Sequence, residues 1–537
     1  MRRPPVSNSI GAAGRCALLL VSSLLVSALG CTNLDENPTS SITPGNFYRN
    51  ESEVLGALAG VYASVRTTLP AYGDSYYDLS EISTDEMIVP TRGQDWYDNG
   101  RWLEIQRQLW TANSPSGLAD INGAWVNAYA GIARANVLLD ALQHVTVPNQ
   151  GSIVAETRAL RAFDYYLLMD MFGGVPIVTT PDISKRARNT RAEVFQFIEK
   201  ELQAARDSGL PATWPAASNG RFTKGAADAI LASMYVNAGV FTKDVGINAT
   251  GYNSCQGVQV SGGDACTAAV AAADRVLNAG VYQLADTFVK NFRADNNLSP
   301  ENIFVVKFIA QDGLGFRLLM TTLHYNQFNP SPWNGFATLA ETYNAFDSTD
   351  KRRQIFLIGQ QYDLATGTIA LKDRTGAPLV FTDTIRDATQ ATEGEGPRIY
   401  KWPFDPAHVG PDNGNDFPFF RLAEMYLIKA EAEVEGATGS QPPLALLKAV
   451  RARSFKTGGD TLSAVDRNVV LRERLFELTF EAKRRQDLIR FGLYTAPRAI
   501  DALAAHNLPT RDPTRVLMPI PQTQIDANPL LKQNPGY

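Results

Sequence analysis

The stretch LRERLFELTFEAKRRQDLIRF, residues 471–491, has apolar side chains on two sides of a helix. One stripe follows helical spacing and consists of Leu471, Leu475, Leu478, Ala482 and Ile489. The phenylalanines that project from roughly the opposite side are Phe476, Phe480 and Phe491. A helix with two apolar sides is packed between neighbours, so we predict one continuous helix held between other elements.

Three carboxylates lie between these stripes at successive i, i+4 positions, namely Glu473, Glu477 and Glu481. Like charges at this spacing repel by a few tenths of a kcal/mol, so cations must balance them. Arg474 and Arg484 are the local candidates, and the remaining carboxylate needs an arginine from elsewhere. Arg485, inside the leucine stripe, needs its own anion. A solvated charged face and a buried ion network both remain open, whereas a catalytic pair would need a cleft that stacked glutamates do not form.

The composition is that of ordinary globular protein, with 537 residues, 45% hydrophobic and 20% charged. This length allows several domains or one extended repeat fold. The formal net charge is −5, and no long basic run is present, so a nucleic-acid partner is not expected.

The N-terminus has the features of an export signal. Arg2, Arg3 and Arg15 precede an apolar run at residues 17–29, which is shorter than the roughly 20 residues of a membrane-spanning helix. The run ends in ALGC, which resembles the bacterial lipobox, in which cleavage precedes a lipidated cysteine. We predict a signal peptide at 1–30, lipidation of Cys31 and a polar tether at 31–46. An uncleaved anchor and a soluble export signal are the alternatives.

Two cysteines remain in the exported body, Cys255 and Cys266, eleven positions apart in an insert rich in Gly, Ser and Asn. Outside the reducing cytoplasm such an even pair favours a disulfide, with free buried thiols as the alternative.

The body alternates amphipathic helices with loops. Helical spacing of apolar residues predicts helices at 51–66, 124–142, 154–172, 190–207, 225–238, 267–279, 422–435 and 443–453. Several are rich in alanine and stop at glycine, as in tetratricopeptide-like helical hairpins, although the spacing is not that of a regular tandem array. A β-branched run at 303–309 predicts a strand.

Two long stretches, 72–110 and 283–420, have little helical period and are where we expect binding, because irregular insertions on a rigid scaffold often carry it. Residues 363–397, polar and rich in Gly and Thr, could also be mobile filler.

Each stretch contains an aromatic cluster with polar neighbours. The first contains Arg92, Asp95, Trp96, Tyr97, Asn99 and Trp102, and the second, at 325–336, contains Tyr325 and Trp333. Aromatic rings offer faces to the C–H groups of a sugar, and carboxylate, amide and guanidinium groups bond its hydroxyls, so we interpret both clusters as candidate sugar sites. The alternative is that the tryptophans are core residues.

No motif supports an enzyme. His144, His324, His408 and His506 are scattered without metal-ligand spacing, and neither a G-x-S-x-G elbow nor a phosphate-binding loop occurs. Residues 412–416, DNGND, could offer oxygens to calcium, but the later bidentate glutamate is missing, so a plain turn is favoured. We predict no cofactor, no metal and no catalytic residue.

At this point the chain resembles the SusD/RagB family of outer-membrane nutrient-binding lipoproteins over nearly its whole length. The resemblance rests on Cys31 with LD at 34–35 and on the segments AETRALRAFDYYLLMDMFGGVPIVT and GRFTKGAADAILASMYVNAG. It continues in RLAEMYLIKAEAEVEG, in LRERLFELTFEAKRRQDLIRFG and in the ending LMPIPQTQIDANPLLKQNPGY.

The resemblance implies a mostly α fold, with tetratricopeptide-like hairpins packed against an irregular binding half that has a few short strands. It also implies one domain at 47–537, with a C-terminal signature at 421–537. The implied function is non-catalytic capture of oligosaccharides or similar nutrients at the outer-membrane surface, as the lid of a SusC-type TonB-dependent transporter. Trp96 and Asn99 are the best carry-overs of family binding positions, and Tyr325 and Trp333 are weaker ones.

Two other classes stay open. A glycoside hydrolase would need paired carboxylates in a cleft. A periplasmic helical-repeat adaptor would bind no glycan.

Overall fold

The computed structural model describes residues 48–68, 74–455 and 459–537. The chain divides into two units, Met1–Arg49 and Asn50–Tyr537, and the following description concerns the second unit. The predicted signal peptide, the lipidated Cys31 and the tether lie outside the described residues. None of the helices in the described part of the chain is long and apolar enough to cross a membrane.

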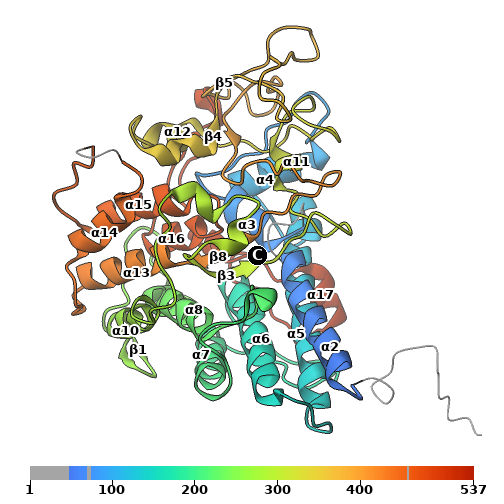
Figure 1. Ribbon diagram of the computed structural model, residues 1–537. Helices are drawn as coiled ribbons and strands as arrows, with labels where there is room; N and C mark the ends of the chain where they lie inside the picture. Colours follow the sequence, from blue (N-terminus) through green and yellow to red (C-terminus); the bar gives the residue numbers. More distant parts are fainter. Residues whose placement is uncertain (1–47, 69–73, 456–458) are drawn as a thin grey trace, which may run out of the picture. The chain divides into compact units, whose positions relative to one another are not determined.

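The main helices form a continuous series and confirm the predicted, mostly α fold class. They are α2 (Glu51–Thr68), α5 (Asn122–Ala141), α6 (Gln150–Phe172), α7 (Arg191–Ser208), α8 (Lys224–Val236), α10 (Ala265–Leu277), α13 (Leu422–Val434), α14 (Pro443–Arg451) and α15 (Arg467–Leu478). Each helix packs on the next, from α2 on α5 through α6, α7, α8 and α10 to α13, which contacts both α14 and α15. Figure 1 shows α5, α6, α7 and α8 side by side. All eight helices predicted from their spacing are present.

Local sequence explains why these helices begin and end where they do. Thr190 caps α7 in a capping box with Glu193, in which each side chain accepts the other residue's backbone N–H. Gly173 ends α6 with φ of 73°, a conformation that glycine adopts without cost. Helix α6 is buried throughout its second half, and α8 is buried from Gly225 to its end, so both helices are covered by their neighbours.

The rest of the unit consists of short elements. The short helices are α3 (Tyr76–Ile82), α4 (Arg101–Arg107), α9 (Ala238–Phe241), α11 (Leu318–Thr322), α12 (Ala340–Ala345), α16 (Arg484–Arg490) and α17 (Gln522–Ala527). Single turns of other helix types are η1 (Asp98–Gly100), η2 (Gly117–Ile121), η3 (Ala216–Ser218), η4 (Phe288–Asn291), η5 (Asn296–Leu298), η6 (Lys351–Ile355), η7 (Ala504–His506) and η8 (Pro513–Val516). The stretch 72–110 is therefore more helical than its sequence indicated, since α3, η1 and α4 lie in it.

The strands form four small antiparallel pairs. Paired in the order β1–β2, β3–β8, β4–β7 and β5–β6, they are β1 (Gln259–Val260), β2 (Gly263–Asp264), β3 (Asn302–Val306), β8 (Phe417–Arg421), β4 (Phe356–Leu357), β7 (Arg398–Ile399), β5 (Gly359–Gln360) and β6 (Val380–Phe381). In the longest pair Asn302 lies opposite Arg421 and Val306 opposite Phe417. Strand β3 is the one predicted at 303–309, and its pairing with β8 ties the start of the long insertion 283–420 to its end.

The prediction of one continuous helix at 471–491 was wrong, because the helix stops at Leu478 and resumes at Arg484. Phe480 and Ala482, in the break, have φ of 66° and 58°. Their backbone N–H groups donate to two buried carboxylates, Phe480 to Glu86 at 2.8 Å and Ala482 to Glu81 at 2.6 Å. Hydrogen bonds to these buried carboxyl oxygens offset the cost of left-handed residues, so tertiary contacts override the helical pattern.

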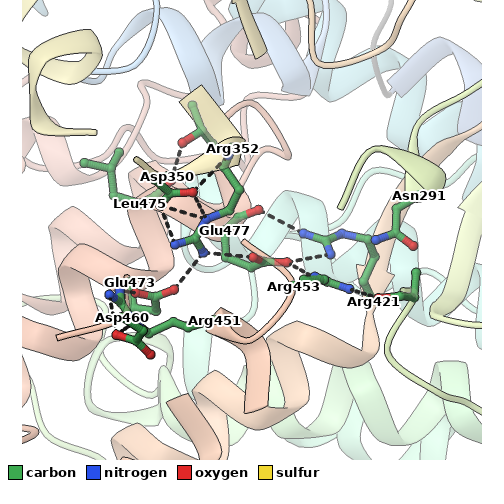
Figure 2. A network of polar contacts seen from close by, with 12 residues as sticks. Asn291, Asp350, Arg352, Arg421, Arg451, Arg453, Asp460, Glu473, Leu475 and Glu477 are labelled. Atoms are coloured by element: carbon green, nitrogen blue, oxygen red, sulfur yellow. Dashed lines mark hydrogen bonds and ion pairs between the residues drawn. The ribbon is translucent and has the colours of Figure 1, made fainter. Parts of the chain in front are cut away.

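The three glutamates of this segment form the buried ion network that the sequence left open, and the solvated face is excluded. Glu477, fully buried, lies 3.0 Å from both Arg352 and Arg421 and also pairs with Arg453. Figure 2 shows these three guanidinium groups turned toward the Glu477 carboxylate. Burial alone would raise the pKa of Glu477, but Arg453, Arg421 and Arg352 hold it well below its ordinary value.

The other two glutamates extend the network. Glu473 pairs with Arg352 at 2.7 Å and with Arg451 at 2.6 Å, while Glu481 pairs with Arg421 at 2.7 Å and with Lys401. Arg421 also reaches Glu301 at 2.6 Å, so the network joins β8 and α15 to the start of β3.

The local partners predicted for these glutamates were wrong. Arg474 instead pairs with Asp487 at 2.8 Å, and Arg484 pairs with Asp85 at 2.7 Å. Arg485 was grouped with the glutamates but lies outside their network. It has the separate anion that its position requires, Asp170 at 3.1 Å, and it donates to the Val516 carbonyl at 2.7 Å.

Candidate functional site

The two aromatic clusters, more than two hundred residues apart in sequence, lie in contact. The indole Nε1 of Trp96 donates to the Trp333 carbonyl at 2.7 Å, and the Tyr325 hydroxyl donates to the Asp95 carboxylate at 2.7 Å. The ring of Trp96 also packs against Phe336, with centroids 5.4 Å apart. The structure therefore unites both candidates in a single site.

Backbone pairing positions the two segments. Ile88 and Ala337 exchange two backbone hydrogen bonds of 2.9 Å, which fixes the chain on either side of the site. Arg92 and Asp95 pair in the same way around a tight turn with Gly93 at φ 69°. This turn leads into η1 and α4 and presents residues 95–99 next to the second segment.

Three predicted sugar-binding residues are structural supports in this geometry. Trp102 is 1% exposed, its Nε1 donates to Asp98 at 2.6 Å, and the Arg101 guanidinium lies 4.2 Å above its ring. Trp96 is 9% exposed, and a Cβ at Gly335 would lie 2.2 Å from its ring. Covered rings offer no face to a sugar, so the core alternative describes both tryptophans better.

Arg92 is the third of these supports. It is buried and donates to the carbonyls of Thr392 and Glu395, the latter at 2.8 Å. Burial lowers the pKa of Arg92 to about 10. Its guanidinium therefore anchors the 392–395 loop beneath the turn.

The other predicted residues remain accessible. Tyr97 is 57% exposed and Asn99 is exposed, while Asp95, Tyr325 and Trp333 are half-buried. Asn99 has φ of 57°, a conformation that asparagine tolerates better than most residues.

Charged side chains surround these residues. The Arg374 guanidinium lies 3.9 Å from the Tyr325 ring centroid, 3.5 Å from Asp95 and 3.4 Å from Glu393. His324 contacts Glu393 at 3.0 Å. We call the accessible set the aromatic surface, and its members are Asp95, Tyr97, Asn99, Tyr325, Trp333, Arg374 and Glu393.

Burial and the Asp95 hydrogen bond together raise the pKa of Tyr325 to about 12, so its hydroxyl stays protonated as a donor. Burial lowers the pKa of His324 despite its contact with Glu393, which favours the neutral imidazole near pH 7. The aromatic surface thus combines ring faces with fixed donors and acceptors, the chemistry that suits a polyhydroxylated ligand.

Comparison with known proteins shows to which family the chain belongs. The sequence profile of the SusD family matches residues 279–537, and a related profile, described as starch-binding associating with outer membrane, matches residues 51–236. The chain belongs to the SusD/RagB family.

Individual SusD/RagB relatives align over most of the chain. SusD-like protein P2 of Formosa agariphila is 24% identical, over 96% of this chain and 98% of its own. The starch-binding protein SusD of Bacteroides thetaiotaomicron is 25% identical, over 86% of this chain and 85% of its own. The second of these relatives is named for starch binding, in line with the prediction that this chain is not an enzyme.

Solved structures of glycan-binding proteins share the fold. A laminarin-binding SusD-like protein superimposes with a TM-score of 0.70 at 24% identity, covering 91% of this chain and 100% of its own. Surface glycan-binding protein A from Bacteroides thetaiotaomicron, in complex with laminarihexaose, superimposes with a TM-score of 0.70 at 20% identity. The superposition covers 90% of this chain and 99% of the other.

Sequence reasoning missed Arg374, Glu393 and the role of His324 in this SusD/RagB chain. Arg374 and Glu393 lie in 363–397, the stretch that could have been filler, and no local pattern marks them. Only their position beside Tyr325 and Asp95 shows their place in the site.

The remaining predicted sites have structural roles. Cys255 and Cys266 form the predicted disulfide, with Cα atoms 5.0 Å apart, at the start of α10. The turn at 412–416 has its carboxylates bound by protein cations, Asp412 by Arg317 and Asp416 by Lys307 at 2.6 Å. A plain turn therefore accounts for that motif.

One group among the described residues brings metal-ligating atoms close together, Asp387, Asp501 and His506. His506 Nδ1 lies 2.5 Å from Asp501, whose carboxylate also accepts the Ala388 N–H at 2.7 Å. These contacts make the group an internal tie between the 385–391 and 500–508 segments.

Proposed function

We propose that this protein is a non-catalytic outer-membrane lipoprotein that captures oligosaccharides and delivers them to a SusC-type TonB-dependent transporter, for which it acts as a lid. The observation that carries the proposal is the meeting of two distant aromatic segments in one accessible surface. Relatives named for starch and laminarin binding support the ligand class.

Capture on the aromatic surface requires no covalent step. Tyr97 and Trp333 offer ring surface to the C–H faces of a pyranose, while Asp95, Asn99 and Arg374 bond its hydroxyls. The hydrogen bond between Tyr325 and Asp95, with Arg374 over the ring, fixes these groups before the ligand arrives, which lowers the entropy cost of binding. Transport energy would come from the transporter's own coupling.

Trp96 acts as a positioning residue and does not contact the sugar itself. Its indole N–H holds the backbone of Trp333, and its ring fills the space under Gly335. Any contribution of Trp96 to affinity therefore passes through the conformation of the 333–336 segment.

The test is the affinity of purified variants for laminarihexaose and maltohexaose, measured by titration calorimetry. We expect Tyr97→Ala and Tyr325→Ala each to weaken binding by about tenfold, roughly 1.4 kcal/mol, with little change in melting temperature. Trp96→Ala should weaken binding and also lower the melting temperature by several degrees, because it empties a packed site.

The matched control is Ile183→Ala, a fully exposed side chain elsewhere. If the parent binds one of the two glycans and both tyrosine variants retain its affinity, the aromatic surface is not the site. Release of reducing ends by the parent protein would instead establish a hydrolase.

A further inference from the structure

A pocket distinct from the aromatic surface lies where the connection between α7 and α8 meets the segment that leads into β3. Its volume is about 180 Å³, and it shares no residue with the aromatic surface. Two rings, Trp214 and Tyr282, and three amides, Asn219, Asn297 and Asn302, are part of its lining.

The Trp214 ring is held in a fixed orientation. Its Nε1 donates to the Phe222 carbonyl at 2.9 Å, and the Arg221 guanidinium lies 3.8 Å from the ring centroid. Arg221 is in turn paired with the buried Glu156 at 2.5 Å. A ring held in this way loses little freedom when a ligand stacks on it.

One of these amides has an acceptor that the protein does not use, whereas the Asn219 amide already donates to the Asn297 carbonyl. The Nδ2 of Asn302 donates to the carbonyls of Asn291 and Asn296, both at 3.3 Å, but its Oδ1 is buried without a partner among the described residues. A buried acceptor left without a donor costs about 1–3 kcal/mol, so a donor from a bound molecule fits here. Asn219 and Asn297 are exposed at the rim of the pocket.

Charge and size narrow the ligand class. The cation in the lining, Arg221, is neutralised by Glu156, so the pocket has no free charge for an ion. Its volume is below the roughly 300–1,000 Å³ of sites for drug-sized ligands, and it corresponds to a single ring. An adjoining cavity of about 420 Å³ shares Asn219, Gly220, Arg221 and Val305, which gives a longer chain room to continue toward α2.

We infer that this pocket binds one neutral pyranose unit of a glycan, as a second carbohydrate site separate from the aromatic surface. The sugar stacks on Trp214, a hydroxyl donates to Asn302 Oδ1, and the rim amides bond the remaining hydroxyls.

The test uses the full protein with Tyr97→Ala and Tyr325→Ala combined, which impairs the aromatic surface and leaves the second site. Laminarihexaose and maltohexaose are titrated into this protein, and crystals of it are soaked in each. We expect residual binding to at least one glycan, weakened tenfold or more by Trp214→Ala and about threefold by Asn297→Ala. Difference density for a sugar ring is expected beside Trp214.

The matched control is Leu298→Ala, a 72% exposed neighbour outside the lining, which should leave the residual affinity unchanged. Asn297→Ala, at the exposed rim, keeps the test valid if Trp214→Ala disturbs the loop. Absence of residual binding, or residual binding that neither variant alters, would overturn the second site. If Trp214→Ala in the otherwise unchanged protein abolishes glycan binding while Tyr97→Ala and Tyr325→Ala do not weaken it, the second site is supported and the aromatic surface is refuted as a binding site.

Discussion

Asp85 and Arg484 form an ion pair on which burial and charge act in opposite directions. Burial alone would raise the pKa of the Asp85 carboxyl, but the Arg484 guanidinium, bonded to both carboxylate oxygens at 2.8 and 2.7 Å, lowers it to about 2. Both side chains are mostly buried, so solvent screens the pair weakly. Arg484 begins α16, and Asp85 follows α3, so the pair ties the C-terminal segment to the first irregular stretch.

This pair predicts a specific loss of stability in acid. A carboxyl whose folded pKa is depressed stabilises the fold above its unfolded value of 3.8 and loses that contribution as pH falls toward 2. We expect the stability difference between the parent and Asp85→Asn to shrink by about 2 kcal/mol between pH 5 and pH 2. Urea unfolding of both proteins across this range measures it.

The control for this experiment is Asp312→Asn, since Asp312 is exposed and its left-handed backbone suits asparagine equally. Its stability difference from the parent should stay near zero at every pH. A pH-independent difference for Asp85→Asn would contradict the assigned ion pair.

At the scale of the element, α15 owes its position to charges as well as to its apolar stripe. Its central carboxylate, Glu477, holds three arginines that come from η6, β8 and the segment after α14. Removal of Glu477 leaves these cations buried with fewer anions. The network therefore couples the helical series to the β3–β8 pair and to the insertion between them.

We expect Glu477→Ala to lower the free energy of unfolding by roughly 3 to 5 kcal/mol, because it breaks a buried ion network from one side. Arg472→Ala is the matched control, an exposed residue of the same helix that should change stability by less than about 0.5 kcal/mol. Chemical denaturation measures both. Equal stability of the two variants would show that the network contributes nothing net.

Helices were predictable because their signals are local. Apolar spacing, the Thr190 cap and the Gly173 stop all lie within a few residues of what they determine. The break after Leu478 was not predictable, because its hydrogen-bond acceptors, Glu81 and Glu86, lie about four hundred residues earlier. The partners of Arg474 and Arg484 were missed for the same reason.

The candidate site follows the same rule. Sequence composition located both aromatic segments and their polar neighbours, but not which rings are covered. Trp96 is buried because Gly335 lets the second segment approach its ring, a contact across more than two hundred residues. Arg374 and Glu393 became visible only when the fold placed them beside Tyr325.

At the scale of the whole molecule, one part of the chain provides the scaffold and another part binds the ligand. The helical series and its ion network form a packed scaffold, while the aromatic surface is assembled from loops that are anchored to it. Delivery to a transporter further requires that the protein be held at the outer membrane, and Cys31, outside the described residues, is the proposed point of attachment.

The anchor and the partner make one joint prediction. We expect the tagged protein, produced in its native cells and extracted with mild detergent from the outer membrane, to co-purify with a SusC-type TonB-dependent transporter identified by mass spectrometry. Cys31→Ser should remove the lipid and shift the protein to the soluble fraction, while its affinity for laminarihexaose or maltohexaose in solution stays that of the parent. Surface labelling of intact cells should reach the parent protein, because a lid on the transporter faces the exterior. A parent protein that fractionates with the periplasm, resists surface labelling and purifies without a transporter would refute the delivery role, whatever its affinity for glycans.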